Sequence, residues 1–140
     1  MSVSNEQKLL SVGLAIAIVA TTGSLYFSLG MGLIPCRLCW YQRILMYPLV
    51  VVFGVALATN DRTVYQTALP LTGVGVVVSG YHSAIQIIGG GVCGSFSCTT
   101  IQFQLLGVLS IPNMAFIAFI GIFGVCVWLR EAKSSTRTEN

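Results

Sequence analysis

Long uncharged stretches alternate with short polar segments along the 140 residues of this chain. A helix needs about 20 mostly apolar residues to cross a membrane, and four stretches reach or approach that length. The pattern therefore predicts spans at about residues 9–29, 41–58, 68–88 and 111–129, with longer loops at about 30–40 and 89–110. The expected fold class is an all-α membrane protein, a four-transmembrane-helix bundle that forms a single membrane domain, 1–140.

Turn and cap residues mark where these spans begin and end. The polar segment Thr59–Thr63 separates the second span from the third, and three glycines at 89–91 end the third. Thr67 is the expected N-cap of the third span, which places Pro70 in the first turn, where a missing N–H costs little. The polar tail at 133–137 is expected to be disordered.

Composition supports a membrane protein. Hydrophobic residues make up 55% of the chain, charged residues make up 8%, and the mean hydropathy is +0.86. Ordinary soluble proteins carry about 25% charged residues. The net charge of +3 comes without a dense cluster of Lys and Arg, which argues against a nucleic-acid partner.

The distribution of Lys and Arg predicts the orientation of the bundle. Short cytoplasmic loops hold the excess of positive charge. With four spans both termini lie on one side, and the bias places that side in the cytoplasm. Both longer loops then face outward, into the compartment where disulfides form and persist. Five cations lie on the side of the termini and two on the other: Lys8, Arg62, Arg130, Lys133 and Arg137 against Arg37 and Arg43.

The first cysteine pair, Cys36 and Cys39, stands just before the second span. The C-x-x-C spacing is typical of thiol oxidoreductases and also of half a zinc site. Cys39 is expected near a helix N-terminus, whose dipole stabilises a thiolate, with Arg43 one turn further on the same face. These features favour a reactive thiol, although the pair also fits an inert staple, and Arg43 also fits a side chain that snorkels to the lipid head groups.

The second pair, Cys93 and Cys98, encloses four residues and follows the three glycines. Such a loop is suited to move, as a disulfide must when it exchanges first with one thiolate and then with another. An alternative is that both pairs bind zinc through four thiolates. The protein would then be a structural or zinc-binding membrane subunit with cysteine-stapled outer loops.

The string Pro35–Arg43 resembles the first outer loop of the DsbB family, in particular its short BdbC-type members. The resemblance extends over nearly the whole chain and includes the order of spans, the second cysteine pair and the segment Gln102–Gly107. It implies a membrane thiol:quinone oxidoreductase in the bacterial cytoplasmic membrane, multi-pass, with its cysteine loops facing outward. Gln42 is a departure, because some family members carry an acidic residue there, and this site should be more positive.

The resemblance also implies a route for electrons. A DsbA/BdbD-like thioredoxin-fold partner would attack Cys93, and Cys98 would then exchange with Cys36. Cys39 would remain as the thiolate that faces the quinone, menaquinone or ubiquinone, while Arg43 polarises a quinone carbonyl. All four paired cysteines are therefore expected to be catalytic.

Two further residues are candidates to bind the quinone. His82 shares a polar face of the third span with Ser79, Ser83 and Gln86, and it either makes an interior hydrogen bond or helps to protonate the quinone. Trp40 either stacks on the quinone ring or anchors the chain at the membrane interface. Cys126 lies deep in the last span without a paired cysteine, and inert packing is expected there.

Overall fold

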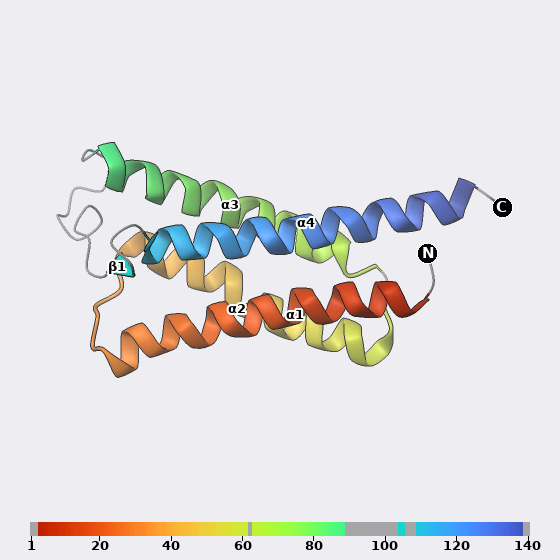
Figure 1. Ribbon diagram of the computed structural model, residues 1–140, viewed down its shortest axis with the longest axis horizontal. Coiled ribbons are helices and arrows are strands. Elements are labelled where there is room, and N and C mark those ends of the chain that lie inside the picture. The colour runs from red at the N-terminus through yellow and green to blue at the C-terminus, as the bar shows by residue number, and fades with distance from the viewer. Residues whose placement is uncertain (1–2, 62, 89–103, 106–108, 139–140) are drawn as a thin grey trace.

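Four long helices form the body of the computed structural model, which describes residues 3–61, 63–88, 104–105 and 109–138 (Figure 1). Helix α1 spans Val3–Leu25 and continues into a π-helical turn, η1, at Tyr26–Gly30. Helix α2 spans Arg37–Thr59, α3 spans Tyr65–Ile88 and α4 spans Ile111–Thr138. Two short strands, β1 at Gln104–Leu105 and β2 at Leu109–Ser110, pair antiparallel just before α4.

The helices run up and down, so that both termini lie at the same end of the bundle (Figure 1). Each helix packs on its neighbour in the chain, and α1 also packs on α4, which closes the bundle. Successive antiparallel helices joined by short connections commonly form such a bundle. The cysteine pair before α2 lies at the end opposite the termini.

All four helices are long and apolar enough to cross a membrane, over Asn5–Gly30, Arg37–Thr59, Tyr65–Ile88 and Ile111–Ser134. This confirms the prediction of an all-helical chain with four apolar spans, and the two-residue strands are the one addition within the described residues. Large apolar side chains such as Val19, Val77 and Val51 are left exposed on the helices. An apolar outer surface of this kind is what a lipid environment requires.

Several helix ends differ from those predicted. Helix α2 begins at Arg37 instead of near 41, because Cys36 caps it. Helix α3 begins at Tyr65, so Thr67 is not its cap and Pro70 lies inside the helix instead of in its first turn. Helix α4 continues to Thr138, so the prediction of a disordered tail at 133–137 was wrong.

A continuous apolar core runs along the axis of the bundle. Its side chains come from all four helices, and Leu49, Phe53, Phe119 and Ile122 are fully buried in it. Cys126 belongs to this core and is also fully buried, which agrees with the prediction that it packs without a chemical role.

Two glycines let aromatic rings lie directly against a neighbouring helix backbone. A Cβ atom on Gly13 of α1 would lie 2.8 Å from the Phe53 ring of α2. A Cβ atom on Gly75 of α3 would clash with the Phe119 ring of α4 more severely still. Small residues at helix contacts allow this close approach, which drives association where lipid removes the hydrophobic effect.

Replacing Gly75 with alanine should therefore lower the stability of the bundle. We expect a loss of about 1–3 kcal/mol from overpacking against Phe119, measured as a lower thermal midpoint in detergent. Gly124→Ala is the matched control, because no atom lies within 4 Å of its added Cβ. The control should be neutral or slightly stabilising, since alanine favours a helix by about 1 kcal/mol over glycine. Equal midpoints for the two variants would contradict this account of the α3–α4 contact.

Candidate functional site

The first cysteine pair forms the N-terminus of α2. Cys36 is the N-cap, with an extended backbone, and its Sγ accepts a hydrogen bond from the Cys39 N–H at 3.3 Å. The two Sγ atoms lie 2.6 Å apart, and both cysteines are free thiols. A disulfide has an S–S bond of about 2.05 Å. The pair can therefore interconvert between dithiol and disulfide with only a small movement of its side chains.

The two sulfurs face different surroundings. Cys36 is 7% exposed and packs beside Ile85 of α3. Cys39 is partly exposed and lines a cavity between α1, α2 and α4. One sulfur is thus turned toward the protein interior, while the other is open to whatever fills the cavity.

The surroundings of Cys36 disfavour its thiolate. A hydrogen bond to the Cys39 side chain, together with burial, raises the pKa of Cys36 to about 12, and a hydrogen bond with His82 acts in the opposite direction. A thiol with so high a pKa is almost entirely protonated at neutral pH. Because the thiolate is the nucleophile, Cys36 needs help to react.

His82 lies behind the cysteine pair. Its side chain is 1% exposed, and its Nε2 atom is 3.7 Å from Cys36 Sγ. On the other side of the ring, Nδ1 is 3.3 Å from Nε2 of Gln42, which is also buried. The interior hydrogen bond that was one of the two expectations for His82 is therefore present. His82 is not among the residues that line the cavity.

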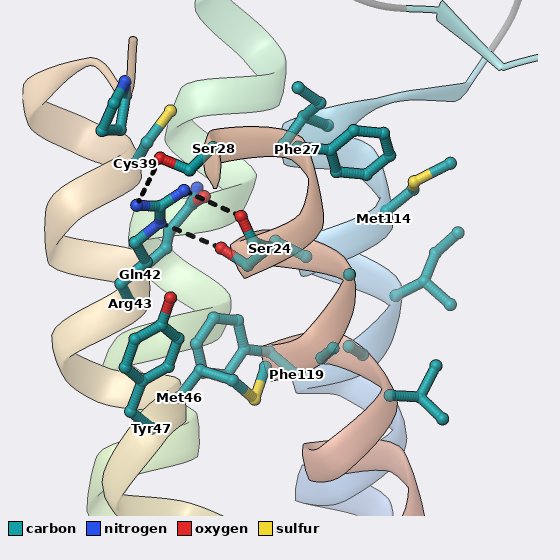
Figure 2. Close-up of a pocket in the computed structure, with 18 of the residues that line it drawn as sticks. Ser24, Phe27, Ser28, Cys39, Gln42, Arg43, Met46, Tyr47, Met114 and Phe119 are labelled. Atoms are coloured by element: carbon teal, nitrogen blue, oxygen red, sulfur yellow. Dashed lines mark hydrogen bonds between the residues drawn. The ribbon is translucent and has the colours of Figure 1, made fainter. Parts of the chain in front are cut away.

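The cavity has a volume of about 610 Å³ and mostly apolar walls. Figure 2 shows Cys39, Gln42 and Arg43 on one wall, with Met46 and Tyr47 of the same helix below them. Phe27 of η1 and Met114 of α4 contribute to the opposite side. A thiol and a cation therefore share an apolar chamber that is large enough for an aromatic ring system.

Arg43 is fixed in this chamber by the end of α1. Its Nε and Nη2 atoms donate to the Oγ and the carbonyl oxygen of Ser24, both at 2.9 Å, and Nη1 donates to Ser28 Oγ at 3.4 Å (Figure 2). Ser28 lies in the π-helical turn η1, a distortion that often occurs at functional sites. The guanidinium is held by neutral groups alone among these contacts, so its positive charge is not neutralised by them.

Trp40 lies beside Arg43 and is not among the residues that line the cavity. Its ring centroid lies 5.6 Å from Arg43 Cζ, close enough for a cation–π contact. The side chain is 54% exposed and does not line the cavity. The structure therefore brings Trp40 to the arginine but not into the chamber beside Cys39.

Cys36, Cys39 and His82 form a group that could hold a metal ion. Their ligand atoms all lie within 4.8 Å of one another. The sequence interpretation had considered zinc only through the four paired cysteines. Cys93 and Cys98 lie outside the described residues, so their expected exchange with the first pair stays a prediction.

Ser24, Ser28 and the contact between Gln42 and His82 were not anticipated from the sequence. The two serines are four residues apart near the end of an apolar helix, a spacing that puts them on one face. That spacing indicated a shared polar face, but only the packing of the helices shows that this face contacts Arg43 of α2. Gln42 had been noted because it stands where some family members carry an acidic residue, not as a partner for histidine.

These features define the class of the protein: a multi-pass membrane protein with a convertible dithiol at the edge of an apolar cavity. The chain belongs to the DsbB family, whose model, described as "Disulfide bond formation protein DsbB", matches residues 6–129. The resemblance inferred from the sequence is therefore confirmed. The family is one of disulfide-forming oxidoreductases, and this chain is a disulfide bond formation protein of that family.

Several curated relatives cover most of the chain. The "Probable disulfide formation protein" of Oceanobacillus iheyensis is 45% identical over 113 residues, which are 76% of this chain and 78% of the relative. The "Disulfide bond formation protein C" of Bacillus subtilis is 40% identical over 124 residues, 85% and 90% of the two chains. A "Probable disulfide formation protein" of Coxiella burnetii is 40% identical over 108 residues, 73% and 74%. No solved structure matches the chain.

The different surroundings of the two sulfurs predict an order of alkylation. In a reduced protein with Cys93, Cys98 and Cys126 replaced by serine, iodoacetamide at pH 7–8 should modify Cys39 before Cys36. Cys36 is the more buried thiol, and its raised pKa of about 12 keeps it protonated until the pH is far above neutral. Mass spectrometry of the digested protein measures the order. Equal rates at pH 7 would show that the two thiols are not differentiated.

Proposed function

We propose that the protein is a membrane thiol:quinone oxidoreductase. It reoxidises an extracytoplasmic thioredoxin-fold disulfide donor, of the DsbA/BdbD-like kind, and passes the electrons through its two cysteine pairs to a membrane quinone. The observation that carries the proposal is the placement of Cys39 and Arg43 together on the wall of an apolar cavity. A bound quinone supplies a two-electron acceptor at that place.

The residues around the cavity fit a quinone. Its walls are mostly apolar, as a flat ring with an isoprenoid tail requires, and its volume of about 610 Å³ accommodates a bicyclic head group. Arg43 spends three of its N–H groups on Ser24 and Ser28. A guanidinium has five N–H donors, so two remain for a carbonyl oxygen in the cavity. Its charge would favour negative charge that develops on that oxygen.

The different surroundings of the two sulfurs support the route of electrons that the family resemblance implies, in which a thiolate of the partner first attacks Cys93 and releases Cys98. The Cys98 thiolate attacks Cys36 Sγ, the bond between Cys36 and Cys39 breaks, and Cys39 leaves as a thiolate. The open position of Cys39 and its neighbour Arg43 support its role as the sulfur next to the acceptor. The second thiol of the partner then releases Cys93, the partner-side sulfur, which attacks Cys98 and releases Cys36, so that the second pair is oxidised again.

The proposed orientation places the termini in the cytoplasm and the first cysteine pair on the outer side of the bacterial cytoplasmic membrane. Lys8 near the start of α1 and Arg130 and Lys133 near the end of α4 belong to the end of the bundle that holds the termini. The excess of positive charge at that end supports a cytoplasmic location. The cysteines at the opposite end would then meet an extracytoplasmic partner.

Cys39→Ser should abolish quinone reduction. In a purified preparation with a reduced thioredoxin-fold donor and a short-chain quinone, the unmodified protein should reduce the quinone, measured by absorbance. Cys126→Ala is the control and should keep the activity, because Cys126 only packs in the core. The proposal fails if the unmodified protein oxidises no donor and reduces no quinone, or if Cys39→Ser remains active.

Arg43→Lys should raise the KM for quinone by about tenfold or more. A lysine ammonium keeps the charge but has three N–H donors, and the three contacts to Ser24 and Ser28 would use all of them. Arg37→Lys is the matched control, because Arg37 is exposed at the start of the same helix and does not line the cavity. An equal change of KM in both variants would indicate an effect of the arginine-to-lysine exchange that does not depend on position, instead of a fixed quinone contact.

A zinc-binding structural subunit is the second candidate function. A structural zinc site is closed by four ligands, and the described residues bring three possible ones together in Cys36, Cys39 and His82. Metal analysis of the purified protein separates the two candidates. Stoichiometric zinc, together with cysteines that do not exchange with added dithiols, would favour the structural subunit over the oxidoreductase.

A further inference from the structure

His82 points at Cys36 and not into the cavity, and this suggests a different role from quinone binding. We propose that His82 is the proton carrier for Cys36: Nε2 takes the thiol proton when Cys36 attacks and returns a proton when Cys36 leaves. The proposal deepens the oxidoreductase function proposed above and rests on it for the reaction that the proton transfer serves. It assigns His82 to the chemistry of the Cys36 sulfur, which does not line the cavity, and not to the quinone beside Cys39.

The geometry isolates this pair of groups from water. Cys36 is 7% exposed and His82 is 1% exposed, while Nε2 lies 3.7 Å from Sγ. That separation is within reach of a hydrogen bond to sulfur. A buried thiol cannot pass its proton directly to solvent, so the neighbouring imidazole is the natural acceptor.

Cys36 has two steps that require a proton to move. When the disulfide of the first pair forms, the S–S bond joins Cys36 to Cys39, the thiol proton of Cys36 moves to Nε2, and two electrons pass to the quinone of the proposed function. When Cys93 attacks Cys98 in the mixed disulfide, the bond between Cys98 and Cys36 breaks. Cys36 then leaves as a thiolate and takes the proton back from Nε2.

Gln42 can serve both states of the imidazole. In the arrangement observed, Gln42 Nε2 lies 3.3 Å from His82 Nδ1. A ring that takes the Cys36 proton at Nε2 must carry its own proton on Nδ1, where the glutamine oxygen can accept it. If the amide turns over, its oxygen accepts from Nδ1–H and leaves Nε2 free to accept. With its oxygen on Nδ1–H, the glutamine supports both the neutral ring that accepts a proton at Nε2 and the imidazolium that returns it.

Few other ionisable groups stand near enough to take over this role. Helix α2 contributes Cys39, the tyrosines Tyr41 and Tyr47, and the cations Arg37 and Arg43, whose guanidinium groups offer donors alone. In this half of the bundle, the described residues of η1 and α3 add Tyr26 and Tyr81, and α4 adds no ionisable side chain before Cys126. The described acidic residues, Glu6, Asp61 and Glu131, belong to the helix ends at the opposite end of the bundle.

The test isolates Cys36 as the single thiol of the full-length protein, with Cys39, Cys93, Cys98 and Cys126 replaced by serine. The second-order rate of its alkylation by iodoacetamide is measured between pH 5.5 and 10, without quinone or partner. With His82 present, we expect the rate at pH 7–8 to exceed that of the His82→Gln variant by about tenfold or more, since general bases typically contribute about 10²–10⁴-fold. The two curves should approach each other as the pH rises toward 10, because hydroxide increasingly takes the thiol proton.

Two further variants keep the test decisive. Ser83→Ala, next to His82 on α3, is the matched control and should leave the whole pH profile unchanged, because its buried Oγ has no hydrogen-bond partner. Gln42→Leu keeps His82 but removes its Nδ1 partner, and it should slow alkylation at pH 7–8 by about threefold or more. Gln42→Leu replaces His82→Gln in the test if the thermal midpoint shows that His82→Gln does not fold.

A change in access to Cys36 would shift all rates by one factor at every pH, whereas loss of a proton acceptor changes the shape of the profile. The proposal is overturned if His82→Gln, or in its place Gln42→Leu, leaves the profile unchanged or lowers it uniformly. Because the assay contains no quinone, a failure of quinone reduction would contradict the proposed function without bearing on this result.

Discussion

The start of α2 is the constraint on which the rest of the site depends. Cys36 caps the helix through its own sulfur, which accepts the Cys39 N–H, and the helical period then sets every direction that follows. Cys39 and Arg43, four residues apart, share the face that lines the cavity. Gln42 precedes Arg43 and reaches the buried ring of His82 on α3. Had the helix begun four residues later, near the predicted 41, neither sulfur would be held in this frame.

Arg43 imposes the second constraint, because a guanidinium in an apolar wall must find partners within the protein. Burying a charge without hydrogen bonds is costly, and here the end of α1 with the following π-helical turn supplies them. Ser24 and Ser28 are uncharged hydrogen-bond acceptors, so they hold the guanidinium without neutralising its positive charge. This arrangement keeps both the position and the field of the cation available to the cavity, and it ties α1 to α2 beside the sulfurs.

The sequence alone predicts much of this architecture, because lipid restricts the choices. Hydropathy identifies all four helices, and the C-x-x-C spacing with Arg43 one turn later predicts that Cys39 and Arg43 share one face, which lines the cavity. The contact between His82 and Cys36 could not be read in the same way, since it depends on how far α3 is rotated and shifted against α2. The polar stripe on α3 predicted that His82 faces inward, but not which neighbour it meets. The capping of α2 by a cysteine could not be predicted from the sequence either, because serine, threonine, aspartate and asparagine are the usual N-cap residues.

The two sulfurs of one pair are thereby given opposite environments at a separation of 2.6 Å. Cys39 faces a cavity with a fixed cation, which favours an anion and a planar acceptor. Cys36 faces a buried imidazole, which favours the exchange of a proton, while burial and Cys39 itself hold its thiol protonated. Dithiol oxidation releases two electrons and two protons, and a site that separates them needs a different neighbour at each sulfur. The packing of α1 and α4 around Cys39, and of α3 against Cys36, provides that separation within a single turn of helix.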